Sequence, residues 1–439
     1  MESVYDQISN GFKDLPENEL LTIHMRSFVD DTERTTYLAG LVSKTANPVL
    51  KYLATSDLRR TEILSKKKLR KGKTLRMFAT FTWDADADVQ DDKVEKLTKG
   101  FLKALYNFSG LEIIKKSQEF FAFLEAGFNA FLLWEQIFTN KMGLTVRALS
   151  AEQLWGDLWH RYNSIPCIPV PQKLIFDRES IKEEINSDIH ALSLLMYREQ
   201  SVPTADYRWM RLKQKFIGLL ALLDQPDSWE TERDAINFYW NKLSEDLVSD
   251  ISIVTQLSKV SQTEMRQRLT DLTKEQIFKA GKASEEGDIN VGAAMDLDEA
   301  LEARAYLHMG HVALSSATVF MVERDTVDEL DRACNYLESL FLYPANLHRE
   351  NTYLWRTWAQ TQPICRTKLL SHPYNRVGKV FSSYVLGTVP LAQVRTIDRS
   401  GVEFLSDDGG VPIYLDLVKK HQNIVFLATT RTGKSVTLT

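Results

Sequence analysis

A strand pattern followed by an amphipathic helix pattern occurs twice in this sequence. The first copy has a period of two over residues 75–82 and helical spacing over 94–108, and the second has the same patterns over 314–322 and 327–341. Such a strand presents one face to a neighbouring layer, and such a helix presents one apolar stripe. We therefore predict two related α/β subdomains. The apolar helix positions correspond at one constant offset: Val94 with Val327, Leu97 with Leu330, and Phe108 with Phe341.

The sequence between the two copies has the pattern of helices. From 181 to 283, charged and apolar residues recur at helical spacing, glycines are few, and Pro203 and Pro226 mark expected breaks. Residues 285–292 have the clearest loop pattern of the second half. We expect an α/β (α+β) chain in four parts: a first α/β subdomain over 1–170, a helical insertion over 171–295, a second α/β subdomain over 296–400, and the start of a further domain over 401–439.

Length and charge limit the classes of protein to which the chain can belong. Its 439 residues suffice for about two or three domains. The net charge of -5 gives no overall case for nucleic acid, so direct DNA binding would need a local basic patch and is left open. No run approaches the roughly 18 apolar residues that span a bilayer. Cys167, Cys334 and Cys365 fit reduced, buried thiols. We expect a cytoplasmic chain without a transmembrane segment.

One motif carries a specific chemical signal. Gly433, Lys434 and Ser435 match the end of the phosphate-binding pattern G-x-x-x-x-G-K-[ST]. The apolar run 424–427 before them has the pattern of a buried strand. The pattern's first glycine is replaced by Ala428. The motif predicts a nucleotide-binding loop, and the alternative is an ordinary turn after a strand.

The chemistry of such a loop assigns a role to each part of the motif. Backbone N–H groups surround the phosphates, a lysine neutralises the β and γ phosphates, and a serine or threonine hydroxyl binds Mg²⁺. Lys434 and Ser435 fit the last two roles, so we predict ATP and Mg²⁺ as cofactors and Ser435 as the metal ligand. The predicted cofactor-binding residues are Thr430, Arg431, Thr432, Gly433, Lys434, Ser435 and Val436.

Two charged segments have both a functional and a structural interpretation. Residues 84–95 place acidic side chains at the spacing of a calcium loop, but Val89 occupies the position that needs glycine. The favoured interpretation is an acidic loop that caps the following helix. The basic run 66–76 could contact phosphates or anionic lipid headgroups. A solvated hairpin end is favoured there.

The residues around the phosphate motif resemble a known family. Residues 410–417 and 422–435 are similar to the entry into the motor domain of the large type IV secretion and conjugation ATPases of the TraC/TrbE type. The resemblance spans most of the chain at the level of pattern. Further matching residues are Asp296, Leu297, Asp298, Glu299, Ala300, Leu301, Glu350, Asn351, Trp355, Pro363, Leu386, Pro390 and Leu391.

The resemblance implies a function for the whole protein. A member of this family couples ATP hydrolysis to pilus assembly or to transfer of DNA or protein, at the cytoplasmic face of the inner membrane. The implied partners are inner-membrane subunits and other secretion ATPases, and the implied oligomer is a dimer or a hexamer. Residues 401–439 would then be the first strand and phosphate loop of a truncated RecA-like motor domain.

The same resemblance implies what this chain does by itself. The family's acidic motif and other catalytic residues would lie downstream of Thr439, so we expect no catalytic residue within this chain. We expect the chain to serve docking and oligomerisation and to hydrolyse no ATP at a meaningful rate. One alternative is a DNA-translocating ATPase of the HerA/FtsK kind. Another is a non-catalytic scaffold subunit whose motif has decayed, as Ala428 permits.

Overall fold

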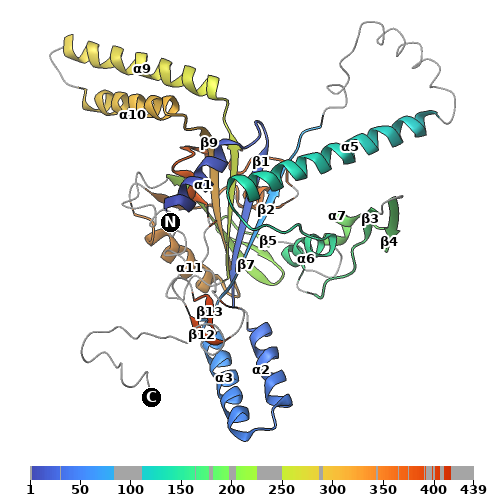
Figure 1. Ribbon diagram of the computed structural model, residues 1–439. Coiled ribbons are helices and arrows are strands. Elements are labelled where there is room, and N and C mark those ends of the chain that lie inside the picture. The colour runs from blue at the N-terminus through green and yellow to red at the C-terminus, as the bar shows by residue number, and fades with distance from the viewer. Residues whose placement is uncertain are drawn as a thin grey trace, which may run out of the picture.

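The protein, described here by a computed structural model, is built around one large sheet. The described residues are 2–29, 31–83, 111–163, 165–176, 181–196, 204–224, 250–285, 290–342, 345–363, 365–373, 375–389, 391, 398, 401–405 and 410–416. Within them, nine strands form this sheet in the order β2-β1-β8-β9-β7-β6-β5, with β10 beside β7 and β11 beside β9 (Figure 1). Neighbouring strands in it pair antiparallel.

The strands of the sheet come from all parts of the described chain. Their bounds are β1 Leu20–Phe28, β2 Gly72–Ala79, β5 Thr204–Ala205, β6 Met210–Leu212, β7 Lys215–Asp224, β8 Ile251–Lys259, β9 Ala313–Arg324, β10 Asn346–Arg349 and β11 Gly378–Phe381. Two separate strand pairs are β3 Gln172–Phe176 with β4 Ile181–Ile185, and β12 Val402–Leu405 with β13 Pro412–Leu415.

Several helices begin where a polar side chain satisfies the first backbone N–H groups. Ser150 and Gln153 form a reciprocal capping box at the start of α6, and the Thr326 hydroxyl accepts from the Glu329 N–H at the start of α11. The helix bounds are α1 Glu2–Lys13, α2 Thr32–Lys44, α3 Pro48–Lys66, α5 Leu111–Gln136, α6 Ala151–Tyr162, α7 Ala191–Leu195, α9 Gln262–Glu285, α10 Val291–His308, α11 Val327–Ser339 and α12 Leu354–Gln360, with a π-helical turn Ile137–Lys141 and a 3₁₀ turn Val385–Thr388.

Both faces of the central strands are buried. On one face, Phe320 of β9 packs in a cluster with Leu330 and Leu337 of α11. On the other face, Val319 packs in a cluster with Trp358 of α12. A third cluster seats α1 and the π-helical turn against the ends of β1 and β8. The fold is therefore a three-layer arrangement with the sheet in the middle.

Several polar side chains inside these layers are paired. The hydroxyls of Thr255 and Thr318 lie 3.0 Å apart between β8 and β9. Gln256 donates to the Thr22 hydroxyl at 3.1 Å and accepts from the Leu369 N–H at 2.8 Å. An unpaired buried amide costs free energy, so Gln256 holds β8 in a fixed position relative to β1 and to the segment after α12.

The structure confirms the mixed α and β class and most of the second predicted unit. The strand predicted over 314–322 is β9, and the helix predicted over 327–341 is α11 with Leu330, Cys334 and Leu337 buried. The first predicted strand is β2, and its helix over 94–108 lies outside the described residues, as does the acidic segment 84–95. β2 and β9 belong to the same sheet, with β1 and β8 between them.

The prediction of a helical insertion is wrong for part of its length. Residues 215–224 and 251–259 form β7 and β8, whereas 262–285 form α9 as predicted. Because β7 is buried on both faces, its apolar residues run almost continuously, and such a run resembles buried helix in sequence. β8 is interrupted by polar residues that are themselves buried, such as Thr255 and Gln256. Strands of this one sheet come from both sides of the predicted domain boundaries near 170 and 295. The positions of the domain boundaries stay a prediction.

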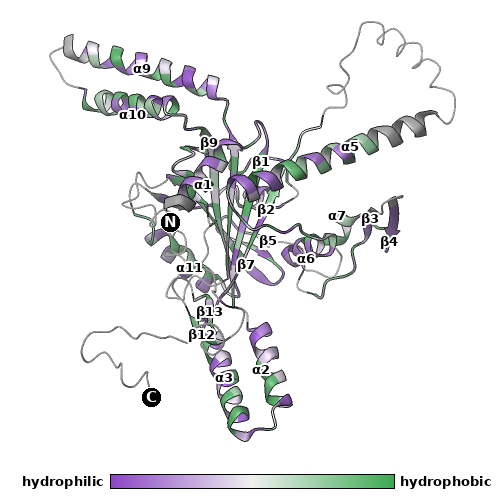
Figure 2. Ribbon diagram, viewed as in Figure 1, coloured by the Kyte–Doolittle hydropathy of each residue, from purple (hydrophilic) through white to green (hydrophobic). Residues whose placement is uncertain are grey.

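Three helical elements project away from the sheet. The α2–α3 pair, the α9–α10 pair and the single helix α5 leave it in three different directions (Figure 1). Apolar residues occur along all three projections, outside the layers that form the core (Figure 2). These projections present surfaces that do not pack against the sheet.

The close approach of β7 to α11 gives the first prediction. A Cβ on Gly218 would lie 3.0 Å from Cys334 Sγ and 3.3 Å from a methyl of Leu330. We expect Gly218→Val to lower the free energy of unfolding by about 1–3 kcal/mol through overpacking. Gly156→Ala is the control, because a Cβ there meets nothing within 4 Å and alanine favours α6. Urea unfolding measures both, and equal stability of Gly218→Val and wild type would contradict the packing.

Candidate functional site

The sequence motif for nucleotide binding lies outside the described residues. This holds for all of Thr430–Val436 and for the strand expected over 424–427. The prediction of a phosphate loop with Lys434 and Ser435 therefore stays a prediction. The described element nearest to it in sequence is the hairpin of β12 and β13, so the candidate site is built from this hairpin and its contacts.

The β12–β13 hairpin lies against the chain that leaves α3. The Lys71 N–H donates to the carbonyl of Gly410 at 3.0 Å. Gly410 has a φ of 64°, and a Cβ there would lie 2.1 Å from the carbonyl oxygen of Leu69. Only glycine fits this close backbone contact at a positive φ. The segment before the motif is thereby joined to a part of the chain more than 330 residues earlier.

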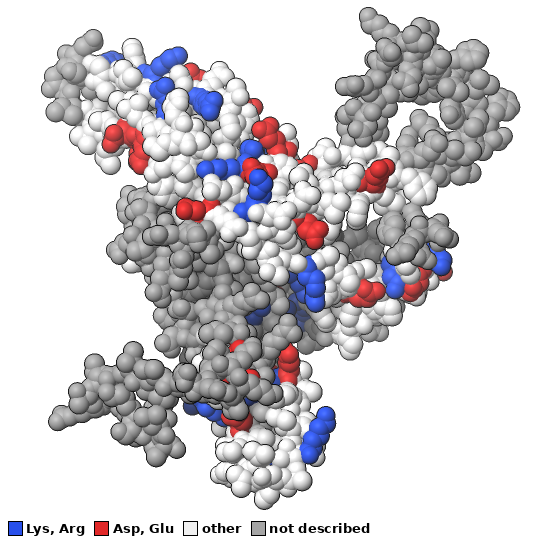
Figure 3. All heavy atoms as spheres, viewed as in Figure 1, with Lys and Arg blue, Asp and Glu red and all other residues white. Residues whose placement is uncertain are grey.

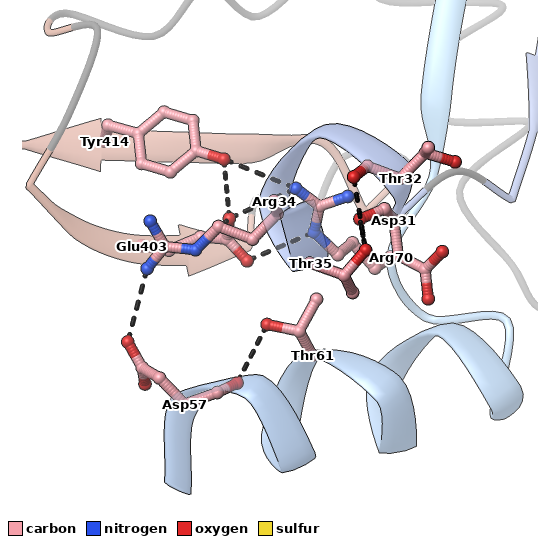
Figure 4. Close-up of polar contacts among 9 residues, drawn as sticks. All are labelled: Asp31, Thr32, Arg34, Thr35, Asp57, Thr61, Arg70, Glu403 and Tyr414. Carbon is pink, nitrogen blue, oxygen red and sulfur yellow. Dashed lines mark hydrogen bonds and ion pairs between the residues drawn. The ribbon is translucent and has the colours of Figure 1, made fainter. Parts of the chain in front are cut away.

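A buried carboxylate forms the centre of this contact. Glu403 of β12 accepts from Arg70 Nε at 3.1 Å and from Arg70 Nη2 at 3.2 Å, which is a bidentate ion pair. The Tyr414 hydroxyl of β13 donates to the same carboxylate at 2.6 Å. The Glu403 side chain is only 10% exposed, and that of Arg70 only 7%. Figure 4 shows these side chains converging between the hairpin and the helices.

A second arginine extends the network to the α2–α3 pair. Arg34 of α2 lies 3.6 Å from Glu403 and 3.2 Å from Asp57 of α3 (Figure 4). Its guanidinium also lies over the ring of Tyr414, 5.5 Å from the centroid. We call Arg34, Asp57, Arg70, Glu403 and Tyr414 the clamp. The clamp joins the α2–α3 pair and the chain that leaves α3 to the β12–β13 hairpin, which is distant in sequence.

The clamp sets the protonation of its members. Burial favours the neutral acid and would raise the pKa of Glu403, but hydrogen bonds from Arg70 and Tyr414 and the charges of Arg70 and Arg34 outweigh it and lower the pKa. Burial and the hydrogen bond to Glu403 raise the pKa of the Tyr414 phenol. At neutral pH the carboxylate is therefore ionised and the phenol is protonated. These states make the clamp a structural contact rather than an acid–base catalyst.

Part of the basic run 66–76 has a different role from the one predicted. Arg70 is 6% exposed and Lys71 is 1% exposed, so the interpretation as a solvated hairpin end is wrong for these two residues. The physical reason is the approach of the β12–β13 hairpin, which supplies Glu403 as a partner. Lys66, Lys67 and Lys68 are exposed as that interpretation expects.

A further charged cluster fastens α6 to the sheet. Asp157 pairs with Arg76 of β2, and Arg161 contacts the ring of His24 in β1. Burial lowers the pKa of the Arg161 guanidinium to about 10. Burial, and then the charges of Arg161 and Arg76, hold the pKa of His24 well below its usual value. His24 is therefore neutral at physiological pH, and its ring accepts a hydrogen bond from Arg161 rather than pairing with a carboxylate.

The described residues offer no metal centre and no membrane span. Among them, no group of three or more His, Cys, Asp or Glu side chains could hold a metal ion. The same residues include no helix with the length and apolar character that crossing a membrane requires. All three cysteines are free thiols, as predicted, but only Cys334 is buried, whereas Cys365 is half-buried and Cys167 is exposed.

Comparison with known proteins adds no identification. No protein-family model matches the chain. A search of curated proteins finds no significant match either. The resemblance to secretion ATPases therefore rests on the residues of this sequence alone.

Sequence reasoning found the motif but not the clamp. Arg70 stood out only as one member of a basic run, and Arg34, Asp57, Glu403 and Tyr414 carry no local pattern. Their partners lie up to 344 residues away, so no spacing rule connects them. Paired substitutions of Arg70 and Glu403 among related sequences would have been the usable signal.

Removing the central carboxylate tests the clamp. Glu403→Ala leaves two buried guanidinium groups without their shared partner, so we expect the free energy of unfolding to fall by roughly 3 kcal/mol. Limited proteolysis should also cut near 401–416 faster, because the hairpin loses its attachment. Glu62→Ala, which removes an exposed glutamate of α3, serves as the control. A variant Glu403→Ala as stable and as resistant as Glu62→Ala would show that the clamp is not formed.

The lowered pKa of Glu403 predicts a pH dependence. Its stabilising effect is fully present above the unfolded-state pKa of about 4.3 and is lost as the pH falls through the lower folded-state pKa. We expect the stability difference between wild type and Glu403→Gln to be largest above about pH 4.3 and to vanish in stronger acid. Urea unfolding of both proteins across this range measures it. A difference that grows as the pH falls would contradict the assignment.

Proposed function

We propose that the chain belongs to an ATPase of the type IV secretion and conjugation class. The observation that carries the proposal is the motif Gly433, Lys434 and Ser435 behind the strand pattern of 424–427. In this proposal Lys434 neutralises the β and γ phosphates of ATP, and Ser435 binds Mg²⁺. The remaining loop residues, Thr430, Arg431, Thr432 and Val436, contribute the backbone that surrounds the phosphates.

In this proposal the described part of the chain serves docking and oligomerisation. It projects helical elements away from the sheet, and such elements suit contacts with inner-membrane subunits and with other copies of the chain (Figure 1). Its expected location is the cytoplasmic face of the inner membrane, and its expected oligomer is a dimer or a hexamer. The start of a RecA-like motor would follow from 401 onward.

The clamp supports a mechanical link between these two parts. Glu403 and Tyr414 lie in the hairpin that precedes the motif, and Arg34 and Asp57 lie in the projecting α2–α3 pair. Separating the partners of a buried ion pair leaves buried charges without compensation, so the pair resists being pulled apart. Motion at the nucleotide site would therefore reach the α2–α3 pair through Glu403.

A scaffold without catalysis is the second candidate. Ala428 replaces the first glycine of the motif, and a Cβ at that position crowds the path by which the backbone approaches a phosphate. A DNA-translocating ATPase of the HerA/FtsK kind is a weaker alternative, because the net charge of -5 provides no overall attraction for DNA.

Nucleotide titration separates these candidates. Calorimetry with Mg-ATP is performed on the 439-residue chain and on a product extended through the proposed motor domain. We expect the extended product to bind ATP and Lys434→Ala to weaken its affinity by about tenfold or more, since a charge-assisted contact is lost. Lys420→Ala is the matched control, because it removes a lysine outside the motif.

The outcomes distinguish the functions. Binding that Lys434→Ala removes and Lys420→Ala preserves supports the ATPase. An extended product that ignores ATP contradicts it and favours the scaffold. Hydrolysis that rises on addition of double-stranded DNA would favour the DNA-translocating alternative.

A further inference from the structure

The α2–α3 pair ends in an exposed apolar tip. Residues 46–53, which join the two helices and open α3, are all exposed, and we call them the hairpin tip. Val49 is 64% exposed, Leu50 55%, Tyr52 74% and Leu53 56%, so each keeps more than half of its surface open. Figure 2 shows apolar colouring at this far end of the pair. Four large apolar residues in one projecting turn need a partner that shields them from water.

The hairpin tip is held in shape by its own cap. The Asn47 side chain accepts from the N–H groups of Val49 at 2.9 Å and Leu50 at 3.5 Å, and Pro48 occupies the first turn of α3. This arrangement fixes the start of α3, because the N–H groups of Val49 and Leu50 already have Asn47 as their acceptor. The apolar side chains are therefore presented by a rigid turn rather than by a loose loop.

The charges around the hairpin tip are all positive. From Arg34 to Ser56 the sequence contains no acidic residue, and Lys44 and Lys51 flank and interrupt the apolar side chains. Both lysines are exposed. In Figure 3 the far end of the α2–α3 pair is drawn mainly as uncharged atoms. The whole chain has a net charge of -5, so this end is opposite in sign to the molecule as a whole.

We propose that the hairpin tip inserts into the surface of an anionic lipid bilayer. Apolar side chains of such a tip enter the boundary between headgroups and acyl chains, to a depth of about 5–10 Å. Lysines beside them remain at the level of the lipid phosphates, and a tyrosine is well suited to the same boundary. Val49, Leu50 and Leu53 supply the apolar contact, and Lys44 and Lys51 supply the attraction to anionic lipid.

The other projecting pair does not fit this partner. In the α9–α10 pair, Phe278 is 73% exposed and Met295 is 61% exposed, so apolar residues are available there too. However, exposed acidic residues surround Met295 on α10, and an anionic surface repels them. These acidic residues are Asp296, Asp298, Glu299 and Glu302. Between the two helical pairs, charge therefore selects α2–α3.

The proposed lipid contact rests on the location proposed above, the cytoplasmic face of the inner membrane. Its experiment measures lipid binding without nucleotide. It can therefore fail while the titration with Mg-ATP succeeds, and the reverse is also possible.

Vesicle flotation of the 439-residue chain tests the proposal. We expect wild type to float with vesicles of phosphatidylcholine and phosphatidylglycerol, and not with vesicles of phosphatidylcholine alone. Leu50→Ser with Leu53→Ser should reduce the bound fraction by about tenfold, because apolar burial is lost. Lys44→Glu with Lys51→Glu should reduce the bound fraction similarly. Because both lysines are exposed, this reduction should not come from unfolding of the tip. Phe278→Ser with Met295→Ser is the matched control and should float like wild type.

Three results would overturn the proposal. The first is equal flotation of wild type with both kinds of vesicle, or none with either. The second is unchanged flotation of both hairpin-tip variants, with circular dichroism showing all proteins folded. The third is a wild-type oligomer in sedimentation that the hairpin-tip variants dissociate, without any vesicle binding, which would assign the tip to a second copy of the chain.

Discussion

Burial of the central sheet on both faces is the constraint on which the rest of the structure depends. β8 and β9 lie inside three layers, so their backbone groups must be paired along the strands and their side chains must suit an apolar environment on both sides. The larger polar side chains there have partners, as Thr255 with Thr318 and Gln256 with Thr22. These pairs fix the register, and the register in turn fixes where the projecting helices leave the sheet.

The clamp obeys the same rule at the edge of the molecule. A carboxylate as buried as Glu403 stays charged only because two guanidinium groups and a phenol compensate the loss of water. The contact therefore has to be complete to be stable. This requirement explains why Arg70 is withdrawn from a run of exposed lysines, and why Gly410 has to approach Leu69 so closely.

The sequence predicted α11 and β9 from their local patterns. α11 was predictable because its polar face is exposed and its apolar stripe meets the sheet, and β9 was predicted from the period of two over 314–322, although both of its faces are buried. β7 was missed because burial on both faces removes the alternation that marks a strand. β8 was missed because Thr255 and Gln256 are buried with partners on other strands, which its own sequence does not show. The clamp was missed for another reason, since Arg70 and Glu403 are 333 residues apart and only the fold brings them together.

The geometry of α2 and α3 connects the two proposals made for this chain. The clamp holds the base of the pair through Arg34 and Asp57, and the hairpin tip lies at the opposite end. α2 has 13 residues, which at about 1.5 Å per residue separates base and tip by about 20 Å. With the tip held at a lipid surface as proposed, the pair therefore places the clamp, and with it the β12–β13 hairpin, about 20 Å from that surface.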